Sequence, residues 1–154
     1  MLKRITGPSD YFQAIQEKDR FEEGYLPIPR KMLAYLGSAN HAIVLAELIS
    51  KHNLWEIKGE TKELDGLPGW FFETHEDILE NTGRFCGREW VIKIIQELKI
   101  VGLVKTQNRG VPPKTHFWIN YSLIDRILSG REKGGMADIK KTTYSTRKER
   151  EELW

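Results

Sequence analysis

The spacing of apolar residues changes at Gly102, and this change limits the folds open to the chain. Downstream of Gly102, residues 103–107 and 115–121 favour strands, and the second alternates with the period of a half-buried strand. Pro112 and Pro113 cannot pair in a sheet, so residues 108–114 are expected to form an exposed tip. Upstream, a helical period of about 3.6 joins Val91, Ile94, Ile95, Leu98 and Val101.

A second helix is predicted just before this one. Residues 70–72 are aromatic and bounded by turn residues, which favours a short strand. Thr74 with Asp77 three residues later resembles a capping box, and Gly83 is a typical helix end. The sequence therefore predicts a helix from about residue 75 to 81, then a longer helix beginning near Gly87 or Arg88.

The fold expected is α+β and mainly helical: a winged helix-turn-helix, with a three-helix core and a small antiparallel sheet. Ser38 caps a first helix over residues 39–53. Residues 54–68 are expected to form a loop or a small hairpin, held down by Trp55 and Ile57. A short helix over residues 30–36 should precede this core, and a last helix over 121–128 should follow it.

The chain divides, on these patterns, into an N-terminal extension (1–37), a winged-helix domain (38–130) and a flexible charged tail or linker (131–154). No window approaches the roughly 20 apolar residues of a membrane helix. The single cysteine, Cys86, rules out an internal disulfide and fits the reducing cytosol, so a cytoplasmic protein is expected.

Basic charge is concentrated on the predicted helix and hairpin. Residues 84–118 hold seven basic and two acidic residues, a net +5, in a chain whose total is +2. A basic motif in a nearly neutral chain suits a polyanion such as DNA, although a solvated basic face is the alternative. Helix residues would meet base edges and phosphates, and the tip would reach the backbone. The candidate DNA-binding residues are Arg84, Arg88, Glu89, Lys93, Gln96, Arg109 and Lys114.

Nothing in the sequence indicates an enzyme, a metal site or a cofactor. Phosphate-loop, zinc-spacing and paired acid–base motifs are absent from the sequence. His41 and His52, near the ends of the first predicted helix, are interpreted as ordinary, partly exposed residues.

One longer stretch carries a resemblance to a known family. The run at residues 98–104, LKIVGLV, looks like the end of a winged-helix recognition helix, and residues 108–120 look like its wing. Together with YLPIPR at 25–30, these motifs are similar to the N-terminal domain of plasmid replication initiators of the RepA type and to DnaD-like replisome organisers of phages. The resemblance implies origin DNA binding as a homodimer, with replication proteins as further partners. The turn at residues 83–87 departs from the family pattern by about two extra residues.

Two other functions stay open at this point. A winged-helix transcriptional regulator would use the same fold. A protein-interaction module would bury the helix face instead, and the apolar Ile92 and Ile100 on that face favour it.

Overall fold

The computed structural model describes residues 4–11, 26–132 and 135. Most of the predicted tail, residues 131–154, therefore lies outside the described residues. Pro8, Ser9 and Asp10 also predict the start of a short helix that would run to Gln16; residues 8–11 are helical, and residues 12–16 lie outside the described residues. The elements follow in the order α2 (Arg30–Leu36), α3 (Ala39–Lys58), β1 (Lys62–Leu64), β2 (Leu67–Phe72), α4 (His75–Asn81), α5 (Arg88–Val101), β3 (Val104–Arg109), β4 (Lys114–Ile119) and α6 (Tyr121–Leu128).

Helix α3 lies at the centre and contacts α2, α4, α5 and the sheet. It is buried on most sides because apolar residues cover more than one face, including Val44, Leu48 and Ile49. Ile94 and Leu98 of α5 and Ile78 of α4 share this core. The predicted α+β, mainly helical architecture and its three-helix core are confirmed.

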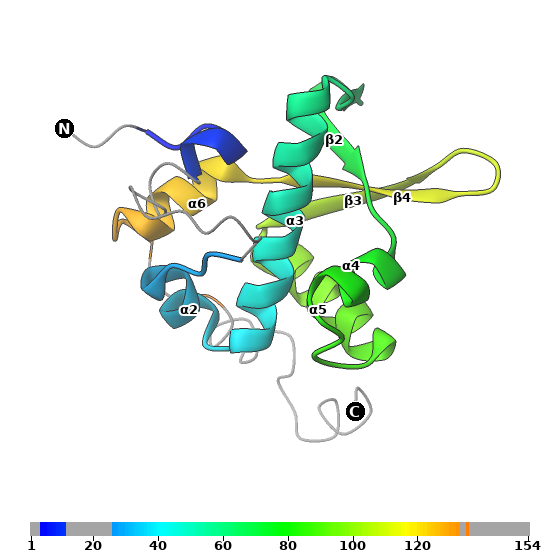
Figure 1. Cartoon of the computed structure of the whole chain (residues 1–154). Helices are drawn as coiled ribbons and strands as arrows, with labels where there is room; N and C mark the ends of the chain where they lie inside the picture. The colour runs from blue at the N-terminus through cyan, green and yellow to red at the C-terminus, as the bar shows by residue number, and fades with distance from the viewer. Residues whose placement is uncertain (1–3, 12–25, 133–134, 136–154) are drawn as a thin grey trace.

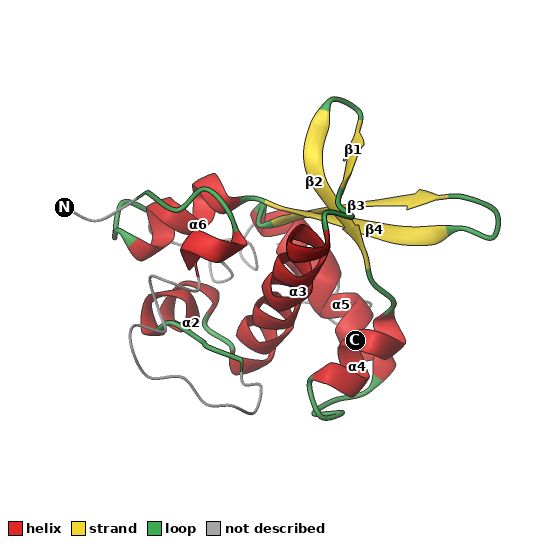
Figure 2. Cartoon of the chain, turned by 45° about the horizontal axis from the view of Figure 1, so that its top comes forward, coloured by secondary structure: helices red, strands yellow, loops and turns green. Residues whose placement is uncertain are grey.

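The sheet has four antiparallel strands in the order β1-β2-β4-β3. Strands β3 and β4 form a hairpin in which Val104 pairs with Ile119, and Phe71 of β2 pairs with Phe117 of β4. Figure 2 shows the two hairpins, β1–β2 and β3–β4, leaving the helical body in different directions. We call the β3–β4 hairpin, residues 104–119, the wing.

The N-terminal segment and α6 pack on the side of α3 away from the wing (Figure 1). The Ile5 amide donates to the Asp125 carboxylate over 2.9 Å, and the Lys31 ammonium donates to the Leu128 carbonyl over 2.9 Å. Met32 and Leu36 of α2 are fully buried. The predicted extension, residues 1–37, thus supplies side chains to the common core.

Two predicted boundaries around the first hairpin are wrong. Helix α3 runs to Lys58, five residues further than predicted, and ends at Gly59, whose φ is 68°. Trp55 packs against the core as expected, but Ile57 is 74% exposed and holds nothing down. Residues 62–64 and 67–72 form the first hairpin, so Pro68 and Gly69 lie in strand β2 and not in a turn.

The strands of the wing are longer at the tip than predicted, which leaves only residues 110–113 as loop. Tyr121 begins α6, so the second strand stops at Ile119. The predicted exposure of two histidines is also wrong. His41 and His52 are 7% and 5% exposed, and His52 stacks on Phe71 at 5.2 Å and shares a 2.8 Å hydrogen bond with the Tyr121 hydroxyl.

Across residues 4–11, 26–132 and 135, no helix has the length and apolar character needed to cross a membrane. Within the same part of the chain, histidine, cysteine and acidic residues do not gather in a group of three that would hold a metal ion.

Candidate nucleic-acid interface

Both ends of α4 are fixed by local hydrogen bonds. The Thr74 hydroxyl accepts from the Asp77 amide over 2.9 Å, as predicted from the capping pattern. At the other end, the Gly83 amide donates to the Glu80 carbonyl and the Arg84 amide to the Leu79 carbonyl, at 3.1 and 2.7 Å. This pair of bonds is a Schellman motif, and it needs the positive φ of 74° at Gly83.

Residues 82–87 connect α4 to α5, and the connection is anchored from inside. Phe85 and Cys86 are half-buried and pack against the core. Burial raises the pKa of the Cys86 thiol, which favours the protonated form of this side chain. The long turn therefore has a defined position, and it sets where the N-terminus of α5 lies.

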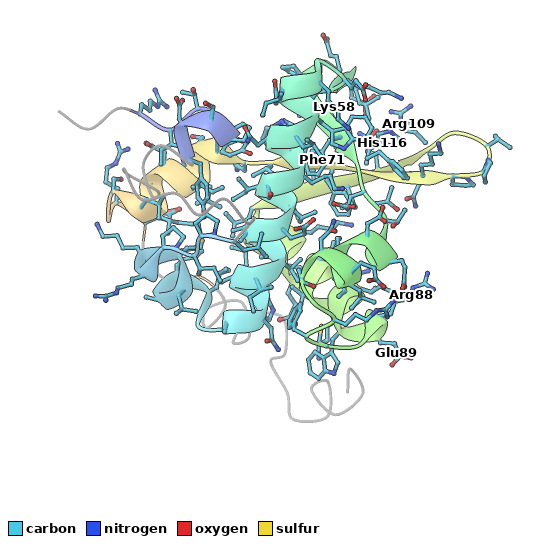
Figure 3. All side chains as sticks on the ribbon, in the orientation of Figure 1. Lys58, Phe71, Arg88, Glu89, Arg109 and His116 are labelled. Atoms are coloured by element: carbon cyan, nitrogen blue, oxygen red, sulfur yellow. The ribbon has the colours of Figure 1, made fainter. Side chains whose placement is uncertain are left out.

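Helix α5 turns its apolar face inward and its polar face outward. Val91, Ile94 and Leu98 are fully buried. Arg88, Glu89 and Gln96 are exposed. Figure 3 shows Arg88 and Glu89 at the first turn, on the side of the molecule toward which the wing extends. The predicted placement of these side chains on an open helix face agrees with the structure.

Lys93 is held differently from the other candidates on α5. Its Nζ lies 5.2 Å from the centroid of the Trp90 ring and is covered from solvent. A DNA contact from Lys93 would therefore require its side chain to rotate away from Trp90. Trp90, which is 44% exposed, was not among the predicted residues. Its position beside the outer face of α5 is visible in the sequence from helical spacing alone.

Arg84 is engaged by the helix that precedes it. Its guanidinium donates to Glu76 over 2.6 Å and also to Glu80. All three side chains are more than half exposed, so these surface pairs are worth little stability. The two carboxylates nevertheless neutralise the positive charge of Arg84, which is the charge that would attract a DNA phosphate. The predicted phosphate contact of Arg84 stays a prediction.

The wing carries charged residues on both strands, and one of these residues, Arg109, contacts the first hairpin. Arg109 donates to the Asp65 carboxylate over 3.1 Å, and Gln107 donates to the same carboxylate over 2.5 Å. The hydrogen bond from Gln107, aided by Arg109, holds the pKa of Asp65 below its usual value. Lys114 lies with its Nζ 5.2 Å from the Phe72 ring centroid.

Sequence reasoning missed this link between the hairpins. An Asp-Gly pair between two short runs is a strong hairpin signal, and here Asp65 and Gly66 both have positive φ, 52° and 80°. That signal predicts the turn. It does not reveal that the turn meets Arg109, because the contact joins residues 44 apart in the chain.

Buried carboxyl groups lie behind the interface, between α3 and the start of α4. Glu73 is 1% exposed, and one of its oxygens is 3.7 Å from the Lys51 ammonium. Burial raises the pKa of Glu73 to about 8 despite Lys51, and the neighbouring Glu47 and Asp77 add to the rise. The Glu73 side chain is therefore mostly protonated at neutral pH.

The fold and the open polar face define the class of this protein. Helices α3, α4 and α5 form a helix-turn-helix core, and a β-hairpin follows the last of them. This arrangement is a winged helix-turn-helix.

Two solved structures are similar to this chain. One, described as "N-Terminal domain of DNA binding protein", superposes with a TM-score of 0.50 at 19% identity, over 75% of this chain and 99% of its own. Another, described as "Structure of Rep-DNA complex", gives a TM-score of 0.49 at 20% identity, over 82% of this chain and 92% of its own. No family model matches the chain, and no curated protein matches it. The first likeness supports the fold alone.

Proposed function

We propose that this chain binds double-stranded DNA, with the N-terminal half of α5 in the major groove and the wing against the adjacent backbone. The observation that carries the proposal is the shared direction of two polar surfaces. In Figure 3, Arg88 at the start of α5 and Arg109 on the wing both lie on the side of the molecule toward which the wing extends, Arg88 below the wing strands and Arg109 above them. A helix and a hairpin arranged in this way can straddle the edge of one groove.

Each candidate has a role that its chemistry fits. Arg88 can donate two hydrogen bonds to guanine, Gln96 can pair with adenine, and Glu89 can accept from cytosine. Arg109 and Lys114 on the wing would neutralise phosphates and supply affinity that does not depend on sequence. The three exposed residues of α5 would therefore set specificity, and the wing would set binding strength.

We further propose that the DNA site is a replication origin, where the chain acts as an initiator or replisome organiser in a homodimer. The resemblance of residues 25–120 to replication proteins supports the role. The solved structure that shares the fold with a TM-score of 0.50 is itself described as part of a DNA binding protein. Selection of bound duplexes from a random library would supply the site, and a site repeated at a replication origin is the expected result. A site confined to promoters would favour the transcriptional regulator.

Fluorescence anisotropy on a duplex tests the DNA binding itself. With wild-type protein we expect the dissociation constant to rise steeply between 50 and 200 mM salt, because bound cations displace counterions. The double change Arg88→Ala and Lys93→Ala should weaken binding at least about tenfold. The control is Arg30→Ala, which removes an exposed charge at the start of α2, on the other side of α3.

Equal binding by the double variant and the wild-type protein would contradict the assignment of α5 as the recognition helix. Absence of binding at both salt concentrations would contradict the function. Thermal melting of each variant separates a lost contact from lost folding.

One observation favours a second function, a protein-interaction module. Trp90 and Ile100 on α5 are 44% and 49% exposed, and large apolar side chains on one helix are typical of a protein contact. Sedimentation of the protein without DNA distinguishes the two. A stable complex that buries α5, together with no DNA binding, would support the module.

A further inference from the structure

A pocket of about 450 Å³ lies between the two hairpins and the end of α3. We call it the inter-hairpin pocket. Its volume falls within the range of about 300–1,000 Å³ that is usual for small-molecule sites. Figure 3 shows Phe71, His116 and Arg109 close together in this region, with Lys58 at the nearby end of α3.

Several aromatic rings contribute to the lining of this pocket. Trp70 and Phe71 are buried, whereas Trp55 and Phe72 are half-buried and so leave part of their surface open. Aromatic faces at the surface are the usual platform for unpaired bases, and each stacked base is worth about 1–3 kcal/mol. Such a platform recognises flat rings without selecting one base sequence.

The charge at the pocket suits a polyanion. Lys62, Arg109 and Lys114 line it together with Glu60, and Arg109 is also paired with the Asp65 carboxylate of the first hairpin. Lys114 places its ammonium over the ring of the half-buried Phe72, 5.2 Å from the ring centroid, so a cation and an aromatic ring lie together at this site. A nucleotide presents the matching pair of features, a flat base and an adjacent phosphate.

The pocket is continuous with the wing. Strand β3 ends at Arg109 and strand β4 begins at Lys114, and both residues line the pocket. Three residues of the wing tip, Gly110, Val111 and Pro112, also line it. A DNA strand that follows the wing therefore passes the mouth of the pocket. Fully paired DNA keeps its bases stacked inside the duplex, so a base can enter only where pairing is broken.

We propose that the inter-hairpin pocket binds one unpaired base of a DNA strand lying along the wing. This inference rests on the proposed duplex binding and adds a second contact to it. The base stacks between Trp55 and Phe72, and Lys62 or Lys114 meets the adjoining phosphate. The site gives the protein a preference for DNA with a locally opened strand.

The test compares three DNA duplexes: one fully paired, one with a single bulged thymine, and one with a bulged abasic residue at the same place. Anisotropy should show that wild-type protein binds the thymine bulge at least about fivefold more tightly than the abasic bulge, the lower end expected of one stacked base. Because the two bulged duplexes differ only in the presence of the base, this ratio reports the contribution of that base.

Two variants locate the effect. Phe72→Leu and Trp55→Leu each keep apolar bulk and remove a ring, so the thymine-to-abasic ratio should fall to about one while affinity for the paired duplex stays within about twofold. Trp118→Leu is the matched control, because Trp118 is a half-buried ring on β4 outside the pocket lining. It should leave the ratio unchanged.

Results against the proposal are distinct from results against duplex binding. A wild-type ratio near one, or a ratio that survives both pocket variants, overturns the pocket. If the wild-type protein does not bind the fully paired duplex, that result overturns the proposed function and not the pocket. In that case a single strand carrying 2-aminopurine gives the answer with wild-type protein, because a base stacked on protein rings loses fluorescence. Unchanged fluorescence at saturating protein overturns the pocket there too, and the same measurement serves if a variant fails to fold.

Discussion

Asp65 offers one of the simplest single changes at the interface. Its carboxylate accepts hydrogen bonds from Gln107 and Arg109, and it brings negative charge to the proposed DNA surface. Asp65→Asn removes that charge and leaves Arg109 available to a phosphate. We expect duplex affinity to rise about two- to fivefold at 50 mM salt, with the gain shrinking as salt screens the charge.

Anisotropy titrations at two salt concentrations measure this effect. Glu132→Gln is the control, because it removes the same charge from the far side, where Glu132 lies 3.8 Å from Arg126. An equal gain from both variants would show that total charge matters and that the Asp65–Arg109 contact does not.

Glu73 predicts how stability depends on pH. Its pKa is about 8 in the folded protein against a usual 4.5, so between these values the folded state holds a proton that the unfolded state has released. The free energy of unfolding should therefore fall as pH rises from about 5 to 8. Glu73→Gln stays neutral at every pH, so its melting temperature relative to wild type should be higher at pH 8.5 than at pH 5.

Melting curves at both pH values check the prediction, with the exposed Glu63→Gln as control. The groups around Glu73 are Lys51, Glu47 and Asp77. If the difference in melting temperature between Glu73→Gln and wild type is the same at both pH values, then Glu73 is ionised in the folded protein and Lys51 compensates for its burial.

At the level of elements, α4 depends on its N-terminal cap. The Thr74 hydroxyl satisfies the Asp77 amide, which has no partner within the helix. Thr74→Ala should lower the free energy of unfolding by about 1 kcal/mol, and Thr74→Ser should restore most of it. Urea denaturation measures both. Equal losses in the two variants would mean that the methyl group, and not the hydroxyl, is what matters.

The same helix shows what a sequence can predict. Its bounds follow from Thr74 and Gly83, because a cap acts on residues three or four places away. The end of α3 was missed because Asn53 looks like a terminus, whereas the stop is the left-handed Gly59 and the extra turn is held by Trp55 against the core. Local signals fix local structure, and packing overrides weak ones.

The exposure of the candidate residues was predictable to the same extent. Spacing on α5 placed Arg88 and Gln96 on an open face, which the structure bears out. The contact of Arg109 with Asp65 and the position of Lys93 against the Trp90 ring were not predictable, since each depends on how side chains meet after folding. The inter-hairpin pocket depends on the pairing of β2 with β4, which joins residues about 45 apart.

For the whole molecule, the salt dependence of binding measures how many cations reach DNA. Each neutralised phosphate contributes about 0.9 to the slope of log affinity against log salt. The double change Arg109→Ala and Lys114→Ala should therefore lower the slope by up to about 2 and weaken binding to all duplexes alike. An unaltered slope would mean that the wing does not touch the backbone.

The order of the strands has a mechanical consequence. Since β2 pairs with both β1 and β4, and α3 leads directly into β1, the wing is braced at its base by the longest helix in the described chain. A sideways force on the tip is transmitted through the sheet to α3 and the core, so we expect the wing to move little relative to the helices. DNA that binds as proposed would therefore meet a wing whose base is fixed in the sheet at Phe71–Phe117 and Phe72–His116.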